Sequence, residues 1–366
     1  MRIIEEEQLD FDDVLIMPRR SSLNSRSEVN IIKNFDYDKQ SDGCCERISG
    51  IPVCCANMAT IATLNMAKIF AKNGFFCALE KHYDAKQINE LYIDLVEDAV
   101  HSGLPAHEYT QRIFPSIGVK ESLANISTLK FYTFGDEHIH GINIDVPNGY
   151  VPQLIDRVKA VRDIFPSAFI IAGNVVTPDI CQDLINAGAN GVKVGIGSGG
   201  MCITRLKTGV GRPQFSTIVE CADACHQMGA FCISDGGCSK PGDICKAICA
   251  GADMVMCGSI FAGAAETNSE RKTIDGKTYC SFYGMSSKLA QEKHFGGMAK
   301  YRASEGREKW IPYTGPLQNT IDDICGSLRS CGTYIGARKI KNFSRQTAFY
   351  KVRHQLNTAY ANYENI

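Results

Sequence analysis

A cysteine, Cys202, follows a run of spaced glycines in the segment VGIGSGGMCITRLKTGVGRPQ, residues 194–214. A thiolate is a nucleophile whereas a thiol is nearly inert, and the positive charges of Arg205 and Lys207 would favour the ionised form. The spaced glycines indicate a backbone that approaches a ligand closely. The segment therefore predicts a nucleophilic cysteine in a loop, with Thr204 as a candidate proton relay.

Two other glycine-containing turns could hold an anion. The sequence SDGG covers residues 234–237, and Gly258 and Ser259 end another apolar run. Bare backbone N–H groups at such turns, together with a helix start, can converge on a phosphate. Either turn alone could be no more than a tight connection between a strand and a helix. Their occurrence together, after consecutive predicted strands, favours a phosphorylated ligand.

Apolar, β-branched runs that end in glycine or polar residues recur along the chain, and each predicts a strand. Segments with helical periodicity, such as VPQLIDRVKAVRDIF and TIVECADACHQMG, lie between them. The predicted strands cover residues 52–58, 75–81, 113–119, 141–146, 169–175, 191–197, 230–236 and 254–258.

The alternation of strand and helix predicts one domain, a (β/α)8 TIM barrel over residues 1–366. The units PDICQDLINAGANGVKVG and PGDICKAICAGADMVMCG echo each other, each with a proline near the helix start and an Ala-Gly-Ala turn into the next strand. Active sites of such barrels lie after the carboxyl ends of the strands. Cys202, the two glycine turns and Asp145 therefore belong to one predicted mouth.

Two long stretches fall outside the regular units. Residues 1–50 form a predicted amino-terminal extension, with RRSSLNSRSEV as a polar loop. Residues 264–318 follow the last strand and contain a hairpin turned at Asp275 and Gly276. A long insertion in a loop at the catalytic end of a barrel is a candidate active-site flap.

The composition argues against a polyanionic or membrane partner. The 366 residues hold 39 Lys and Arg against 40 Asp and Glu, so there is no bulk charge to recruit nucleic acid or a membrane surface. The amino terminus is acidic, and no apolar run approaches the roughly 18 residues of a spanning helix. We expect a cytoplasmic protein whose 17 cysteines are thiols. Their spacing lacks the paired clusters of a zinc site.

The quoted cysteine segment, together with SDGGCSKPGD, FYGMSS and YRASEG, resembles the inosine monophosphate dehydrogenase and guanosine monophosphate (GMP) reductase family. The likeness runs from LDFDDVLIMPRRSSLNSRSEV to TYIGARKIK, nearly the whole chain. Residues 81–113 leave room for one helix and a short loop, so the tandem regulatory domain common in the dehydrogenases is expected to be absent. The segments LDFDDVLIMPRRSSLNSRSEV, TRLKTGVG and YRASEG resemble the reductase branch.

For the reductase branch, the resemblance implies reductive deamination of GMP to inosine monophosphate (IMP), a step of purine salvage. Cys202 would attack C2 of the purine to form a covalent thioimidate. Thr204 and Glu305 would form a dyad that protonates the departing ammonia. NADPH would then deliver hydride to C2, and the thiolate would leave. General acid assistance is chemically reasonable because an amine is a poor leaving group.

The resemblance also assigns binding groups. A homo-oligomer, a tetramer, is implied, with some cofactor residues supplied by a neighbouring subunit. The nucleotide residues would be Asp235, Gly236, Gly237, Gly258, Ser259, Gly284, Met285, Ser286, Arg302, Ser304 and Gly306. The NADPH residues would be Ser25, Arg26, Lys81, Asp145, Val146, Pro147, Ile196, Gly197, Met285, Tyr301, Arg302, Ser330, Cys331, Gly332 and Thr333. A monovalent cation, K⁺, would lie near Gly197, Gly199, Cys202 and Arg205.

Several positions depart from the reductase pattern. Ala59 stands in place of aspartate, Glu80 of histidine, Pro147 of alanine and Ser259 of glycine, while Arg212 matches the dehydrogenases better than the reductases. Two alternatives therefore remain open. The first is a dehydrogenase without its regulatory domain, and the second is a purine-nucleotide-binding barrel that has lost catalysis.

Overall fold

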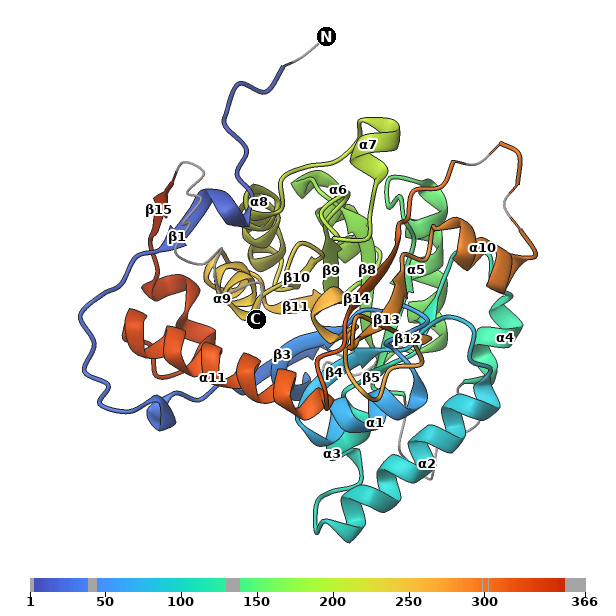
Figure 1. The fold of residues 1–366 in the computed structure, drawn as a ribbon, viewed down its shortest axis with the longest axis horizontal. Coiled ribbons are helices and arrows are strands. Elements are labelled where there is room, and N and C mark those ends of the chain that lie inside the picture. Colours follow the sequence, from blue (N-terminus) through green and yellow to red (C-terminus); the bar gives the residue numbers. More distant parts are fainter. Residues whose placement is uncertain (1–2, 39–44, 130–138, 298, 302, 353–366) are drawn as a thin grey trace.

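The computed structural model describes residues 3–38, 45–129, 139–297, 299–301 and 303–352 (Figure 1). Its centre is a sheet of parallel strands in the order β5-β4-β3-β11-β10-β9-β8-β7-β6. The strands are β3 (Cys45–Cys55), β4 (Phe75–Ala78), β5 (Ile113–Phe114), β6 (Ser116–Ile117), β7 (Gly141–Asp145), β8 (Phe169–Val175), β9 (Gly191–Val194), β10 (Phe231–Asp235) and β11 (Met254–Cys257).

The sheet closes into a barrel at Pro115. The third predicted strand is observed as two short pieces, β5 and β6, on either side of this proline. β5 pairs with β4 and β6 pairs with β7, so the two ends of the sheet meet in one segment of chain. Proline has no N–H to donate to a ladder, which accounts for the break. The predicted (β/α)8 barrel is confirmed.

Helices follow most strands, and in Figure 1 α5, α6, α8 and α9 lie around the strands β8 to β11. Three of these helices, α5, α6 and α9, begin with a proline in the first turn, a position that needs no N–H. The helices are α1 (Leu64–Lys72), α2 (Ala85–His101), α3 (His107–Thr110), α4 (Leu123–Thr128), α5 (Pro152–Ile164), α6 (Pro178–Asn186), α7 (Thr204–Thr208), α8 (Gln214–Gln227), α9 (Pro241–Cys249), α10 (Lys288–Phe295) and α11 (Leu317–Ile335).

The amino-terminal extension contains a strand that the sequence analysis missed. β2 (Lys33–Asp38) pairs antiparallel with the first half of β3, which begins at Cys45 rather than at the predicted residue 52. Phe35 of β2 is fully buried and makes edge contacts with Phe76 and Phe169 inside the barrel, with ring centroids 5.7 and 6.0 Å apart. This aromatic cluster closes the amino end of the barrel, so burial rather than a turn signal determines the strand.

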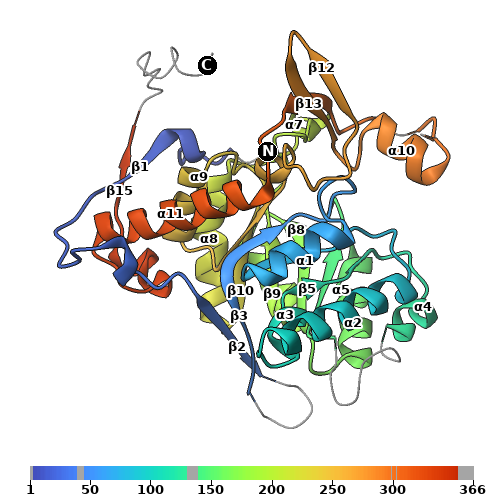
Figure 2. The same cartoon turned by 60° about the horizontal axis from the view of Figure 1, so that its bottom comes forward.

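The segment after β11 forms a small antiparallel sheet of β12 (Arg271–Ile274), β13 (Lys277–Tyr283) and β14 (Glu308–Pro312). β12 and β13 are joined at Asp275 and Gly276, whose φ angles of 49° and 74° fit a tight hairpin turn of the kind predicted there. Figure 2 shows β12, β13 and α10 at the same end of the barrel as α7, and β2 at the other end.

Two further elements complete the described chain. β1 (Val14–Ile16) pairs antiparallel with β15 (Phe349–Lys351), and α11 packs on α9. Within the described ranges, no helix is both long enough and apolar enough to cross a membrane.

Candidate active site

The loop after β9 carries Cys202 and is pressed against the neighbouring strand β10. A side chain at Gly195 would place its Cβ 2.1 Å from the Asp235 carbonyl oxygen, so only glycine permits this approach. Gly195 and Gly197 also have positive φ angles, 146° and 77°, which other residues rarely adopt. The spaced glycines therefore shape the loop that ends at Cys202, directly before α7.

Cys202, Thr204 and Glu305 form a continuous hydrogen-bonded chain. The Cys202 thiol donates to Thr204 Oγ1 over 3.1 Å, and the Thr204 hydroxyl donates to Glu305 Oε2 over 2.7 Å. All three side chains are partly exposed, so a ligand can reach them. The arrangement offers a path for a proton between the sulfur and the carboxylate.

Glu305 reaches this position because the insertion pairs with the cysteine loop. Cys202 and Gly306 form an isolated antiparallel bridge, and the Ile203 N–H donates to the Glu305 carbonyl over 2.8 Å. A Cβ at Gly306 would lie 2.5 Å from the Ser287 backbone nitrogen. The glycine after Glu305 thus allows the two halves of the insertion to pack closely beside the thiol.

Arg205 does not act on the thiol in the way its sequence position suggested. Its guanidinium donates to Asp10 over 3.4 Å and to the Arg212 carbonyl over 2.5 Å. Lys207 is exposed. Proximity in sequence therefore did not translate into a contact, and the hydrogen-bond partner of the sulfur is Thr204.

A network of buried charges lies at the carboxyl edge of the barrel. Lys193 of β9 is fully buried and contacts Asp145 of β7, while its Nζ lies 3.8 Å from Asp235 of β10. Lys81, after β4, pairs with Asp145 over 2.8 Å. Three strands and one loop are thus joined through two carboxylates and two ammonium groups.

The two aspartates of this network respond differently to burial. Burial opposes ionisation of Asp145, but Lys193 and Lys81 outweigh it and hold the pKa of Asp145 well below its ordinary value. Burial dominates at Asp235 and raises its pKa, because Lys193 is farther away and Asp145 adds a like charge. Asn174 donates to Asp235 over 2.7 Å. Asp145 is consequently the fixed anion of the site.

Sequence reasoning missed three members of this network. Lys193 and Asn174 lie within strands, and Asn57 donates to Asp145 over 3.1 Å. A lysine inside the otherwise apolar strand GVKV was the available signal, since such a residue must face a carboxylate in the barrel interior. The two asparagines carried no comparable signal.

The glycine turns after β10 and β11 present unused backbone donors. Gly236 and Gly237 both have φ angles of 86°. Within the described part of the chain, the N–H groups of Gly237 and Gly258 donate no hydrogen bond. Gly258 directly precedes the short 3-10 helix of Ser259 to Phe261. Free N–H groups at two adjacent turns are suited to an anion.

The predicted nucleotide residues of the insertion border the same site. Met285 Sδ accepts a hydrogen bond from the Ala59 N–H over 3.4 Å, and the Ser286 carbonyl accepts from Glu305 N–H over 3.2 Å. Gly284 packs on Met201 and Gly306. Ser304 donates to the Gly306 carbonyl over 3.2 Å.

The remaining predicted cofactor residues fall into separate groups. Val146 and Pro147 directly follow Asp145 at the end of β7, and Tyr301 is 89% exposed. Arg302, predicted for both nucleotide and cofactor, lies outside the described residues.

A second group lies apart from the cysteine loop. Ser25 caps a 3-10 helix that begins at Arg26 and packs on α11. The carboxyl-terminal half of α11, which contains Ser330, Cys331, Gly332 and Thr333, lies away from α7 in both Figure 1 and Figure 2.

The backbone of the cysteine loop could hold a monovalent cation. Within the described residues, the carbonyl oxygens of Gly197 and Cys202 accept no hydrogen bond, whereas that of Gly199 accepts from Cys202 N–H over 2.9 Å. The Ile196 carbonyl accepts from Arg212 N–H. Carbonyl oxygens are the ligands that replace the water shell of K⁺. These backbone carbonyl oxygens therefore fit the implied K⁺ ion chemically.

Arg212, one of the departures from the reductase pattern, has a structural role here. Its guanidinium contacts Glu220 of α8 and donates to Gln8 over 2.7 Å and to the Val176 carbonyl over 3.0 Å. It thus ties the end of the cysteine loop to α8 and to the amino terminus.

The cysteines whose side chains the structure describes are all free thiols, as predicted. Most are buried, whereas Cys202 is partly exposed. Burial raises the pKa of the internal thiols, for example Cys54 and Cys55, and keeps them protonated.

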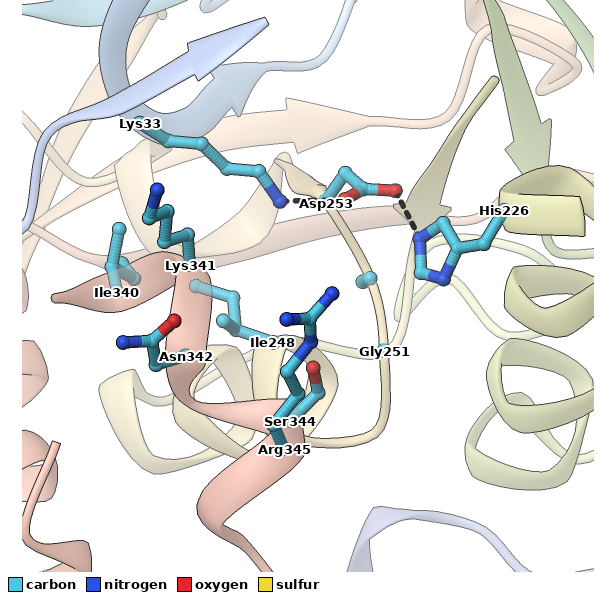
Figure 3. A pocket seen from close by; sticks show the side chains of 11 residues that line it. Lys33, His226, Ile248, Gly251, Asp253, Ile340, Lys341, Asn342, Ser344 and Arg345 are labelled. Carbon is cyan, nitrogen blue, oxygen red and sulfur yellow. Dashed lines mark hydrogen bonds and ion pairs between the residues drawn. The ribbon is translucent and has the colours of Figure 1, made fainter. Parts of the chain in front are cut away.

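A cavity of about 340 Å³ lies beside the amino end of β11 and the carboxyl end of α8, with Lys33, His226 and Asp253 among its lining residues (Figure 3). Lys33 pairs with Asp253 over 2.5 Å, and His226 contacts the same carboxylate over 2.8 Å. Lys341 and Arg345 also line the cavity. Residues at this end of a barrel generally serve stability.

Together, the fold and the carboxyl edge define a (β/α)8 barrel with a cysteine–threonine–glutamate chain at its mouth. A family model described as the IMP dehydrogenase / GMP reductase domain matches residues 8–358. The chain belongs to this family.

Curated relatives match over almost their full length. GMP reductase of Vibrio parahaemolyticus is 44% identical over 360 residues, which cover 98% of this chain and 99% of the relative. GMP reductase 2 of Mus musculus is 44% identical over 364 residues, with the same coverage. GMP reductase 2 of Homo sapiens is 43% identical over 363 residues, which cover 98% of each chain.

Proposed function

We propose that this protein is a GMP reductase, which converts GMP to IMP and ammonia with oxidation of NADPH. The observation that carries the proposal is the hydrogen-bonded chain from Cys202 through Thr204 to Glu305. It combines a nucleophile for C2 of the purine with a group that can protonate a leaving amine. The full-length similarity to proteins named GMP reductase supports the same reaction.

The first half of the reaction uses the protein's own groups. The thiol proton moves to Thr204 and on to Glu305 as Sγ bonds to C2 of GMP. The same relay then returns the proton to the 2-amino group, so the C2–N bond breaks and ammonia leaves. A covalent thioimidate between Cys202 and the purine remains.

In the second half, NADPH supplies a hydride to C2 when it is bound. The C2–S bond breaks, the purine becomes IMP, and the sulfur leaves as a thiolate. Cys202 must therefore serve as nucleophile and as leaving group, a dual role to which sulfur is well suited.

The nucleotide is proposed to lie between the glycine turns and the insertion. Gly236, Gly237, Gly258 and Ser259 would hold the phosphate, supported by the unused N–H groups of Gly237 and Gly258. Asp235 would also contact the nucleotide. Gly284, Met285, Ser286, Ser304 and Gly306, with Arg302, would cover the base as a flap.

NADPH is proposed to approach from the side of Lys81 and Asp145. Asp145 is held ionised and in place by two ammonium groups, a rigid support for a polar cofactor group. Ser25 and Arg26, with the 330–333 segment of α11, lie apart from the cysteine loop, which supports their use by the site of a neighbouring subunit. We therefore propose a tetramer, located in the cytoplasm, with K⁺ in the cysteine loop.

A second candidate is an IMP dehydrogenase, favoured by Arg212. The Arg212 contacts with Glu220 and Gln8 weaken that case because they account for the residue without catalysis. In addition, the elements observed between β4 and β5 are α2 and α3, which supports the reductase branch.

The test is substrate choice by the purified protein. With GMP and NADPH, we expect nicotinamide absorbance to fall as ammonia appears in equal amount. With IMP and NAD⁺, we expect little turnover. Turnover only in the second mixture would establish the dehydrogenase, and nucleotide binding without turnover in either would indicate a non-catalytic barrel.

A further inference from the structure

Three metal-ligating side chains from distant parts of the sequence meet beside the barrel mouth. Glu80 and His82 follow β4, and His294 lies in α10 of the insertion. One ligand atom from each lies within 4.8 Å of those of the other two. The rings of His82 and His294 stack with centroids 4.1 Å apart and planes 3° from parallel.

Two of these ligand atoms are buried without a hydrogen-bond partner among the described residues. Glu80 Oε2 and His294 Nε2 are shielded from solvent, and neither makes a hydrogen bond within the described residues. A buried polar atom without a partner costs free energy, so such atoms call for an explanation. The neighbouring ammonium group, on Lys81, forms an ion pair with the Asp145 carboxylate and a hydrogen bond to its carbonyl, rather than an ion pair with Glu80.

A cation at this position would give the shielded oxygen of Glu80 and the shielded nitrogen of His294 a partner. An imidazole nitrogen that carries no proton offers its lone pair to a metal.

We propose that Glu80, His82 and His294 form a binding site for a divalent transition metal, with Zn²⁺ as the best match. Two imidazole nitrogens and one carboxylate oxygen are a common donor set for zinc, with a water as fourth ligand. Zn–ligand distances of about 2.0–2.2 Å place tetrahedral donors about 3.4 Å apart. The three atoms must therefore approach each other, and the stacked rings must turn so that both lone pairs face the ion. His82 is exposed to solvent.

A metal at this site would link the barrel to the insertion. Glu80 and His82 belong to the connection after β4, whereas His294 belongs to the segment that leads to Glu305. Binding would hold α10 against the rim and thereby restrict the insertion that carries the catalytic carboxylate. The metal site is thus separate from the residues proposed to bind GMP, NADPH and K⁺. Metal binding there would restrict how the insertion opens over the active site.

The test uses Co²⁺ as a spectroscopic probe on the full-length protein after treatment with a chelator. We expect saturable binding of one Co²⁺ with visible absorbance typical of a tetrahedral nitrogen and oxygen site. The variants His294→Ala and Glu80→Gln should each weaken binding by about tenfold or more, because each removes a ligand. The matched control is His101→Ala, at the exposed end of α2, which should bind as the original protein does.

Three outcomes would overturn the site. They are the absence of saturable binding, equal affinity in His294→Ala and the control, or an intense near-ultraviolet sulfur-to-cobalt band that shows binding by thiols. Circular dichroism of each variant distinguishes the loss of a metal-binding side chain from unfolding of the protein. The readout does not depend on GMP turnover, so it remains decisive even if the proposed reaction is wrong.

Discussion

Thr204 donates a hydrogen bond of 2.7 Å to Glu305, a residue 101 positions later in the sequence. The same hydroxyl accepts from the Cys202 thiol over 3.1 Å. The insertion after β11 thus supplies the far end of a relay whose near end lies in the loop after β9. The proposed nucleophile, Cys202, and the proposed acid, Glu305, come together only when these two segments pair.

The relay predicts a selective effect of Glu305→Gln. The amide cannot take up and return a proton, so kcat should fall by about 10²–10⁴-fold, while the KM for GMP changes little. Steady-state kinetics with GMP and NADPH measure both parameters. Glu292→Gln, an exposed position of α10 in the same insertion, is the matched control and should retain full activity. An equal loss in both variants would argue against a proton role.

The close packing at Gly306 predicts that Gly306→Ala impairs catalysis without unfolding the barrel. A Cβ there would lie 2.5 Å from the Ser287 nitrogen, so the backbone beside Glu305 must shift. Because a shift of about 1 Å in a positioned group can cost about 100-fold, kcat should fall strongly. Gly326→Ala in α11, where a Cβ meets open space, should keep activity and gain about 1 kcal/mol of stability. Full activity of Gly306→Ala would mean that Glu305 tolerates displacement.

Lys193→Met should destabilise the barrel severely. The substitution leaves Asp145 and Asp235 in the interior without their shared ammonium group, a loss expected to cost about 3–5 kcal/mol. Urea unfolding followed by circular dichroism gives the free energy of unfolding. Lys288→Met, at an exposed position of α10, should change it by less than about 0.5 kcal/mol. A similar value for both variants would show that the buried network contributes little.

His226 predicts a stability change near neutral pH. Its hydrogen bond and attraction to Asp253, against an opposing effect of burial, raise the pKa of His226 in the folded state. The folded protein therefore holds this proton more tightly than the unfolded chain, whose histidine pKa is about 6.5. The resulting stabilisation is full below that value and is lost as pH rises through the folded pKa. The melting temperature of His226→Gln should decline less steeply above pH 6.5 than that of the original protein. The melting temperature of the control His101→Gln should decline as steeply as that of the original protein.

The sequence predicted the barrel because its signals are local. The predicted strands combine an apolar run with a glycine or polar stop, and the segments between them have helical periodicity, with a proline in the first turn of α5, α6 and α9. The same logic put Cys202 at the mouth, since the carboxyl ends of parallel strands share one edge. The hairpin at Asp275 and Gly276 was equally local, because those two residues accept positive φ angles.

The missed features depend on tertiary contacts. β2 is a strand because Phe35 completes the aromatic cluster inside the barrel, which no neighbouring residue indicates. Arg205 lies three residues from Cys202 but contacts Asp10, because it belongs to α7 and its contacts depend on how that helix packs. Glu305 was predicted only from the family resemblance. Without it, pairing across 101 residues could not have been inferred from residue types.

The most direct test of the central claim compares the protein with Cys202→Ala in the presence of GMP and NADPH. Loss of NADPH and release of ammonia are followed together, and GMP binding is measured separately by calorimetry. We expect equal NADPH loss and ammonia release by the original protein, and no turnover by the variant despite retained GMP binding, because phosphate binding and covalent chemistry use different groups. Turnover by Cys202→Ala at a comparable rate would contradict the central claim.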